Sequence, residues 1–249
     1  MSGHSKWATI KRAKGKTDVA RGKIFSKFAR EITVAAKIGG SDLSGNPRLR
    51  LSIERARASN MPKDNIQRAI EKGAGGGDSA AIEELMYEGY GPAGAAIIAE
   101  VMTDNKNRTL GEIQFIFTRN GGNMGKSGSV SWQFTKFGVI TADKSKTDSE
   151  KLINDAIEAG AEDVSEEGQT IEIKTKPENF EEILKKLKDK GYEISSSEIT
   201  LLPNATIAVS GDDARKLLNL VEALEEHDDV QNVYSNFDIP DEIMAQESK

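Results

Sequence analysis

The segment KWATIKRAKGKTDVARGK, from Lys6 to Lys23, concentrates positive charge in a chain whose formal net charge is -6. Seven of its side chains are cationic and one, Asp18, is acidic. Closely spaced cations favour a polyanionic partner, because their charges add and guanidinium groups donate paired hydrogen bonds to phosphate oxygens. The segment therefore predicts phosphate contacts from Lys6, Lys11, Arg12, Lys14, Lys16, Arg21 and Lys23.

Trp7 lies among these cations, and two roles are open to it. An aromatic ring between positive charges is suited to stacking on an exposed base. The same ring is equally suited to anchoring a charged segment onto a folded domain. The residues before Asp18 contain little else that is apolar, so we expect this arm to become ordered only on a partner.

Charge divides sharply at the glycine run GAGGG, Gly73 to Gly77. Residues 1–77 hold 17 Lys and Arg against 6 Asp and Glu, a net charge of +11, whereas the remainder holds 17 against 34, a net charge of -17. Two blocks of opposite sign indicate two functional units. A solvated basic surface without a partner is the alternative, but a block of this size favours nucleic acid.

Three short helices are predicted in residues 1–77. The first begins near Asp18 and ends at Gly39-Gly40, the second begins at Asn46-Pro47, and the third begins at Pro62 and ends at Gly73. Their helical spacing predicts an apolar core of Ile24, Phe28, Ile32, Leu49, Ile53, Ala56, Ile66, Ala69 and Ile70. Their remaining faces carry further candidate phosphate contacts, namely Lys27, Arg30, Arg48, Arg50, Arg55 and Arg57.

Beyond residue 77 the pattern changes to strands alternating with helices. Strands over IEELMYEGYG and AAIIAEVMTD flank the turn Gly91 to Gly94, a helix follows from Asn105 to Gly121, and SVSWQF alternates as a strand. Residues 137–202 contain the β-α-β-β-α-β order of a ferredoxin-like domain. The segments ATIAVS, DDARKLLNLVEALEEH and VQNVYSNF add another β-α-β unit, which we expect to form a second such sheet with residues 95–134.

The expected fold class is α+β, with an N-terminal three-helix bundle followed by two ferredoxin-like α/β domains, one inserted in the other. The basic helical domain with its arm spans residues 1–77. The discontinuous α/β domain spans 78–135 and 203–240, the inserted domain spans 136–202, and a tail covers 241–249.

Most catalytic chemistry is disfavoured by composition. The chain has no cysteine and only two histidines, His4 and His227, so we expect no catalytic residue, metal, cofactor or small-molecule substrate. Gly125-Lys126-Ser127 resembles the end of a phosphate-binding P-loop, but the glycine spacing is wrong and the segment joins a helix to a strand instead of a strand to a helix. We expect Lys126 to be a second, weaker phosphate contact.

Acidic pairs such as Glu83-Glu84, Glu166-Glu167 and Glu181-Glu182 are typical of a solvated surface, and Asp104 to Asn107 is explained by a helix cap. No run reaches the roughly eighteen apolar residues of a membrane helix, and no secretory signal is recognised. We therefore expect a cytoplasmic protein without a membrane partner.

Five ordered segments resemble one known family: GHSKWATIKRAKGKTDVARGKIFSKFAREI, NMPKDNIQRAIEKG, YEGYGPAGAAIIAE, TDNKNRT and GGNMGKSGSVSWQF. The chain is similar to the YebC/PmpR family from Gly3 to about Pro240, a family that includes the mitochondrial translational activator of cytochrome c oxidase. The resemblance implies a helical N-terminal domain, two α/β domains and a non-enzymatic role in binding nucleic acid. Members are described as DNA-binding transcriptional regulators, and others as ribosome-associated factors that aid translation.

Two partners therefore remain, duplex DNA and ribosomal RNA with the ribosome. Duplex DNA favours a recognition helix that presents Asn, Gln or Arg to base edges. RNA favours a glycine-containing basic arm that orders on phosphates, which KRAKGKTDVARGK matches better. The residues alone favour a translation factor slightly over a DNA-binding transcriptional regulator, and an enzyme acting between the acidic domains is a third, weaker hypothesis.

Overall fold

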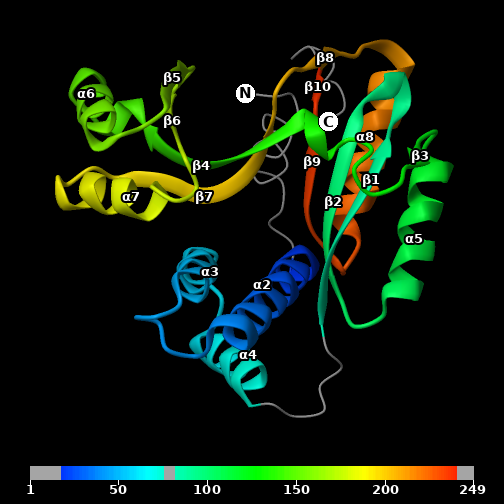
Figure 1. Cartoon of the computed structure of the whole chain (residues 1–249), viewed down its shortest axis with the longest axis horizontal. Helices are drawn as coiled ribbons and strands as arrows, with labels where there is room; N and C mark the ends of the chain where they lie inside the picture. The colour runs from blue at the N-terminus through cyan, green and yellow to red at the C-terminus, as the bar shows by residue number, and fades with distance from the viewer. Residues whose placement is uncertain (1–17, 76–81, 240–249) are drawn as a thin grey trace. The chain divides into compact units, whose positions relative to one another are not determined.

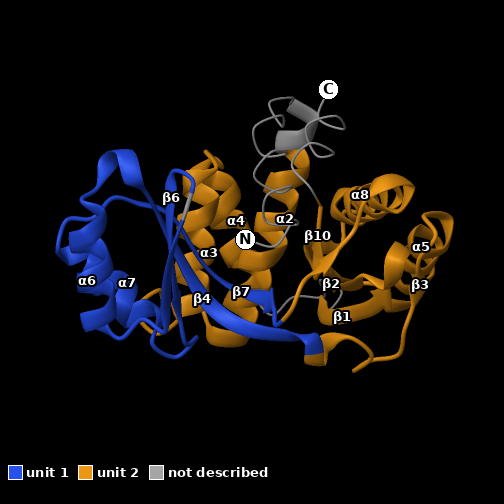
Figure 2. Ribbon diagram, turned by 90° about the horizontal axis from the view of Figure 1, so that it is seen from above, with its two compact units in different colours: residues 1, 133–204 blue, residues 2–132, 205–249 orange. Residues whose placement is uncertain are grey.

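The structure, a computed structural model, describes residues 18–75 and 82–239. These residues form helices and two four-stranded sheets, which confirms the α+β class. They divide into two compact units, one of residues 133–204 and one of the described residues on either side of it (Figure 2). Among the described helices, none combines the length and apolar character that a membrane span requires.

Residues 18–75 fold into three helices, α2 (Asp18–Gly39), α3 (Pro47–Ala58) and α4 (Lys63–Ala74) (Figure 1). Asn46 fixes the start of α3, because its side-chain oxygen accepts a hydrogen bond from the Leu49 amide at 3.0 Å. Its side-chain amide also donates to the Ala35 carbonyl of α2 at 2.9 Å, which ties the two helices together. The three helices enclose one core, formed by Ile32, Ala35, Ala36, Leu49, Ile53, Ala56, Met61, Ile66 and Ala69.

Two details of the predicted bundle are wrong. Ile24 is 41% exposed, because α2 has 22 residues against 12 in each of its neighbours and its first turns extend past them. Gly73 lies inside α4 and does not end it. A Cβ atom there would lie 2.3 Å from the Thr33 carbonyl oxygen, so this glycine permits the close approach of α4 to α2.

The first sheet has the strand order β3-β1-β2-β9, with every neighbouring pair antiparallel. Helices α5 and α8 pack on the face that carries Ile97, Ala99 and Val101, and they lie side by side in Figure 1. Phe117 of α5 and Leu217 of α8 are fully buried against this face. The elements are β1 (Glu83–Tyr90), β2 (Ala96–Thr103), α5 (Lys106–Arg119), β3 (Asn123–Met124), α8 (Gly211–Glu226) and β9 (Val230–Ser235).

Two predicted strands of this sheet are wrong. In SVSWQF, residues Ser131–Gln133 form a 3-10 turn, because the amides of Val130 and Ser131 bond to a side chain and not to a neighbouring strand. In ATIAVS, only β8 (Ile207–Ala208) is extended, and it pairs in parallel with β10 (Phe237–Asp238) in a separate two-stranded sheet. The sheet is instead completed by β1, which pairs with both β2 and β3.

The inserted unit, residues 133–204, has the ferredoxin-like element order that the sequence predicts. Its sheet order β5-β6-β4-β7 is fully antiparallel, and helices α6 and α7 pack against one another. Gly138 admits Phe180 of α7 to the sheet, since a Cβ atom there would lie 2.4 Å from the phenyl ring. The elements are β4 (Phe134–Asp143), α6 (Ser149–Ala159), β5 (Asp163–Glu167), β6 (Thr170–Thr175), α7 (Phe180–Asp189) and β7 (Ile194–Pro203).

Candidate nucleic-acid interface

Much of the predicted interface lies in the N-terminal arm. Lys6, Trp7, Lys11, Arg12, Lys14 and Lys16 fall outside the described residues, as does the side chain of Arg21. Their predicted roles therefore stay predictions. The structure places the other candidates, which are Lys23, Lys27, Arg30, Arg48, Arg50, Arg55, Arg57 and Lys126.

Three of the four α3 arginines contact other parts of their own unit. Arg48 forms a two-point ion pair with Glu84 of β1, which raises the pKa of the guanidinium group. Arg50 donates to the Leu43 carbonyl oxygen at 2.7 Å. Arg55 lies 3.2 Å from a Glu31 carboxylate oxygen, with its guanidinium carbon 5.9 Å from the centre of the Phe28 ring.

The cations of α2 approach the C-terminal end of α8 within the same unit. Lys23 donates to the Glu226 carbonyl oxygen at 3.3 Å and Lys27 donates to the Glu225 carbonyl oxygen at 2.7 Å. Arg30 donates to the Asp228 carbonyl oxygen and forms a 3.1 Å ion pair with Asp229. The last carbonyls of a helix lack intrahelical partners and carry partial negative charge, so they attract cations much as phosphates do.

Asp229 is the buried centre of this contact and is 2% exposed. Burial acts to raise its pKa, but hydrogen bonds from Thr109 and Arg108, both at 2.7 Å, and the charge of Arg30 lower it. Sequence reasoning missed this carboxylate, and the acidic run around it gives no signal that one member is buried.

Glu112, His227 and Asp229 form a group with metal-like spacing among the described residues, their ligand atoms lying within 4.8 Å of one another. The Asp229 carboxylate is already paired with two guanidinium groups, whose positive charges repel a cation. The Nδ1 atom of His227 accepts a hydrogen bond from the backbone N–H of Asp229, and its Nε2 atom lies 2.9 Å from a carboxylate oxygen of Glu112. The cluster is therefore explained by hydrogen bonds and ion pairs without a metal.

Several cations on the surface of the helical region were left out of the predicted site. Lys37, Lys63, Arg68 and Lys72 are all exposed, as is the predicted Arg57. They lie at the ends of α2 and α3 and along α4. The sequence signal that identifies them is that each cation lies away from the apolar face of its helix.

Lys126 belongs to a tightly held segment that we term the glycine loop, residues 125–131. The Glu88 carboxylate, 4% exposed, accepts hydrogen bonds from the backbone N–H groups of Gly128, Val130 and Ser131, each at 2.8 Å. Burial acts to raise the pKa of Glu88, but these three donors lower it. The anion bound by these amides is thus the protein's own carboxylate, which explains why the P-loop-like sequence is not a phosphate cradle.

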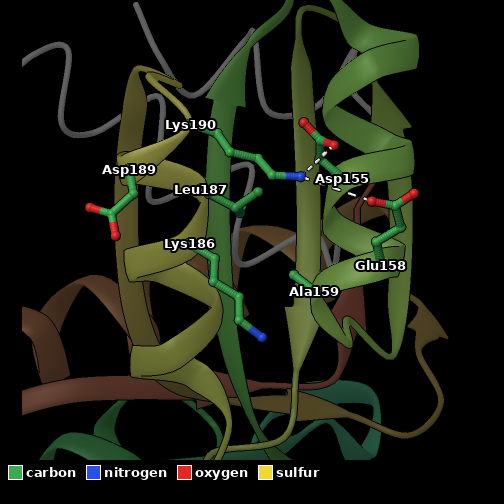
Figure 3. Close-up of a pocket in the computed structure, with 7 residues that line it drawn as sticks. All are labelled: Asp155, Glu158, Ala159, Lys186, Leu187, Asp189 and Lys190. Carbon is green, nitrogen blue, oxygen red and sulfur yellow. Dashed lines mark hydrogen bonds and ion pairs between the residues drawn. The ribbon is translucent and has the colours of Figure 1, made fainter.

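A shallow pocket lies on the inserted unit between α6 and α7 (Figure 3). Lys190 lies across it, with its ammonium nitrogen 2.7 Å from Asp155 and 3.9 Å from Glu158. Partial burial and the hydrogen bond to Asp155 raise the pKa of Tyr192 to about 12. The Lys190 ammonium group thus pairs with two of the carboxylates that line the pocket. The lining residues are Asp155, Glu158, Ala159, Lys186, Leu187, Asp189 and Lys190.

Comparison with known proteins accounts for almost the whole chain. Residues 5–76 match the TACO1/YebC protein N-terminal domain, and residues 82–237 match the TACO1/YebC second and third domain. The chain belongs to the TACO1/YebC family. Two relatives are called probable transcriptional regulatory protein, one from Geotalea uraniireducens and one from Dictyoglomus turgidum. Each is 54% identical, and each alignment covers 98% of both chains.

The TACO1/YebC fold is also known from a solved structure. The conserved hypothetical protein Aq1575 from Aquifex aeolicus superposes with a TM-score of 0.83 at 45% identity, covering 90% of this chain and 92% of that chain. This similarity confirms the order of a helical region followed by two α/β sheets. In this TACO1/YebC chain, the match to the N-terminal domain ends at residue 76 and the match to the second and third domain begins at residue 82. This boundary lies close to the point at which the net charge of the sequence changes sign.

Proposed function

We propose that this protein is a non-enzymatic regulator of gene expression that binds nucleic acid through its basic N-terminal region. The observation that carries the proposal is the net charge of +11 in residues 1–77 of an otherwise acidic chain. Family membership supports it, since the relatives from Geotalea and Dictyoglomus are named as regulatory proteins of transcription and not as enzymes.

Duplex DNA is the first partner to test. The residues alone favour RNA slightly, but the names of the curated relatives point to transcription. Duplex DNA is therefore placed before RNA as a candidate partner. The exposed cations Arg57, Lys63, Arg68 and Lys72 provide a helical surface for phosphates.

Ribosomal RNA on the ribosome is the second candidate. The glycine-containing arm KRAKGKTDVARGK favours it, because such a segment adapts to irregular phosphate positions better than to a regular groove. A second feature in its favour is an exposed aromatic side chain, Trp132, which is hydrogen-bonded to the glycine loop that carries Lys126.

The test replaces five arm cations of the full-length protein with glutamine. Binding to a labelled duplex, measured by fluorescence anisotropy at several salt concentrations, should weaken strongly and lose most of its salt dependence, expected near a log-log slope of about -5 for about six phosphate contacts. Melting temperature should change little, since exposed charges contribute about 0.5 kcal/mol or less each. The five residues are Lys6, Lys11, Arg12, Lys14 and Lys16.

A control variant removes the same charge from the inserted unit and should bind as the wild type does. Its five glutamine substitutions are at Lys136, Lys151, Lys176, Lys185 and Lys188. Equal losses in both variants would contradict an arm-based interface. Sedimentation of both variants with ribosomes then separates the candidates, because a protein that needs its arm for ribosomes and not for duplex DNA is a translation factor.

A further inference from the structure

The glycine loop, residues 125–131, is held in one shape by contacts to β1. Besides the three amides bound by the Glu88 carboxylate, the Gly125 amide donates to the Glu88 carbonyl oxygen at 2.8 Å. The Ser129 amide donates to the Lys126 carbonyl oxygen at 3.0 Å, which closes a turn at the tip. Gly125 cannot carry a side chain without movement, since its Cβ atom would lie 2.3 Å from the Ser129 hydroxyl oxygen. The loop therefore presents its surface in a fixed conformation.

Two aromatic side chains are fastened to this loop at a single atom. The Tyr90 hydroxyl donates to the Ser129 carbonyl oxygen at 2.9 Å, and the Trp132 indole N–H donates to the same oxygen at 3.1 Å. The polar atom of each ring is thus directed at the loop. Because these bonds restrict rotation of both rings, little conformational entropy is lost when a ligand contacts them.

The same rings remain on the surface. Trp132 is 71% exposed and Tyr90 is 37% exposed. Contact between a large aromatic ring and water is unfavourable, and burying the ring against a partner removes that contact. An ordered, exposed indole is therefore a common feature of binding surfaces.

The charge on the glycine loop indicates the kind of partner. Lys126 and Ser127 are exposed at the tip of the glycine loop, and the nearby Glu88 carboxylate is buried and engaged by amides. A cation and a hydroxyl on the loop that holds two aromatic rings suit a ligand with a flat apolar face and an adjoining anion. A nucleotide within a single strand has both, whereas a base in a duplex is covered on both faces by its neighbours.

We propose that Trp132 and Tyr90, both held by the glycine loop that carries Lys126, form a stacking site for an unpaired nucleobase of a single strand. The site lies outside the basic region and rests on the proposed binding of nucleic acid, to which it adds selectivity for strand form. Its chemistry serves single-stranded DNA and RNA alike, because stacking uses the face of the base and not the sugar.

The test uses the full chain with Trp7→Phe, which leaves Trp132 as the sole tryptophan of a protein that has two. A labelled 12-nucleotide RNA, the DNA strand of the same sequence and the matching DNA duplex are titrated separately. Anisotropy of the label reports total binding, and Trp132 emission reports stacking at the site. Both single strands, or one of them, should quench the emission, and the duplex should bind without quenching it.

Variants of the same chain separate stacking from folding. Trp132→Ala should weaken single-strand binding about tenfold and duplex binding less than twofold, whereas Trp132→Phe should retain most of the affinity. Phe115→Ala is the matched control, since Phe115 is an aromatic residue of α5 that is 61% exposed, and it should change neither affinity. Melting temperatures of all variants check the fold.

Each outcome decides the proposal. Quenching by RNA alone or by DNA alone supports it and identifies the strand. Binding without quenching, with Trp132→Ala equal to Phe115→Ala, overturns the stacking site and leaves the proposed function standing. Equal quenching by the duplex overturns the selectivity for unpaired bases, and absence of any binding, by the wild-type chain as well as by the Trp7→Phe chain, overturns both the stacking site and the proposed function.

Discussion

Helix α3 and the glycine loop offer positive charge in opposite ways. Helix α3 carries four arginines between Arg48 and Arg57, and three of them contact groups of their own unit. The glycine loop has a single cation, Lys126, but its backbone is fastened by a buried carboxylate and stands beside exposed aromatic rings. Charge composition thus indicates that a region suits an anion, whereas hydrogen-bond partners decide which side chains are presented.

The largest expected effect comes from breaking the support of the glycine loop. Glu88→Ala should lower the free energy of unfolding by about 3 kcal/mol, because three backbone N–H groups lose their shared acceptor. Urea unfolding measures the change, and Trp132 emission of the same variant made in the Trp7→Phe chain reports whether the loop has moved. A variant that unfolds like the wild type would contradict the fastening of the loop by Glu88.

The same carboxylate predicts a dependence on pH. Its folded pKa is lowered from the ordinary value of 4.5, so its contribution is present above that value and is lost as pH falls through the folded pKa. The difference in stability between the wild type and Glu88→Gln should therefore shrink as the pH falls below about 4.5. A constant difference across this range would argue against a stabilised carboxylate.

A smaller loss is expected at a second buried carboxylate, that of Asp229. Asp229→Asn should lower the free energy of unfolding by about 2 kcal/mol, because the amide replaces a charge that pairs with Arg30 and Arg108. Glu193→Gln is the matched control, since Glu193 pairs with Lys146 at 2.6 Å while both side chains are more than half exposed. Thermal melts should show less than about 0.5 kcal/mol for the control, and similar losses in both would remove the distinction between buried and exposed pairs.

The smallest effects distinguish two arginines of one helix. Arg55→Gln should lower stability by about 1 kcal/mol, since it loses the Glu31 ion pair and the contact with the Phe28 ring. Arg57→Gln, at an exposed position, should leave stability within about 0.5 kcal/mol and weaken duplex binding. Chemical denaturation and anisotropy measure both quantities, and the reverse pattern would show that the ion-paired Arg55, and not the exposed Arg57, serves the anion.

Local signals in the sequence determined most of the secondary structure. Asn46-Pro47 predicts the start of α3 because an asparagine cap and a proline at the first helical position act within one turn. The turn Gly91 to Gly94 between β1 and β2 and the Asn105 cap of α5 are local in the same sense. The alternation and charge of the remaining segments also sufficed to predict the α+β class.

Tertiary structure alone decided the partners of the polar groups. Residues Ser131–Gln133 alternate between polar and apolar side chains as a strand would. The Ser131 amide, however, donates its hydrogen bond to the Glu88 carboxylate, more than forty residues earlier, and the segment forms a 3-10 turn outside the sheet. Arg30 is a surface cation in the sequence, but folding brings it to Asp229 across 199 residues. Caps and periodicity depend on neighbours along the chain, whereas burial and ion pairing depend on neighbours in space. The pattern of residues in one sequence does not show which residues become neighbours in space.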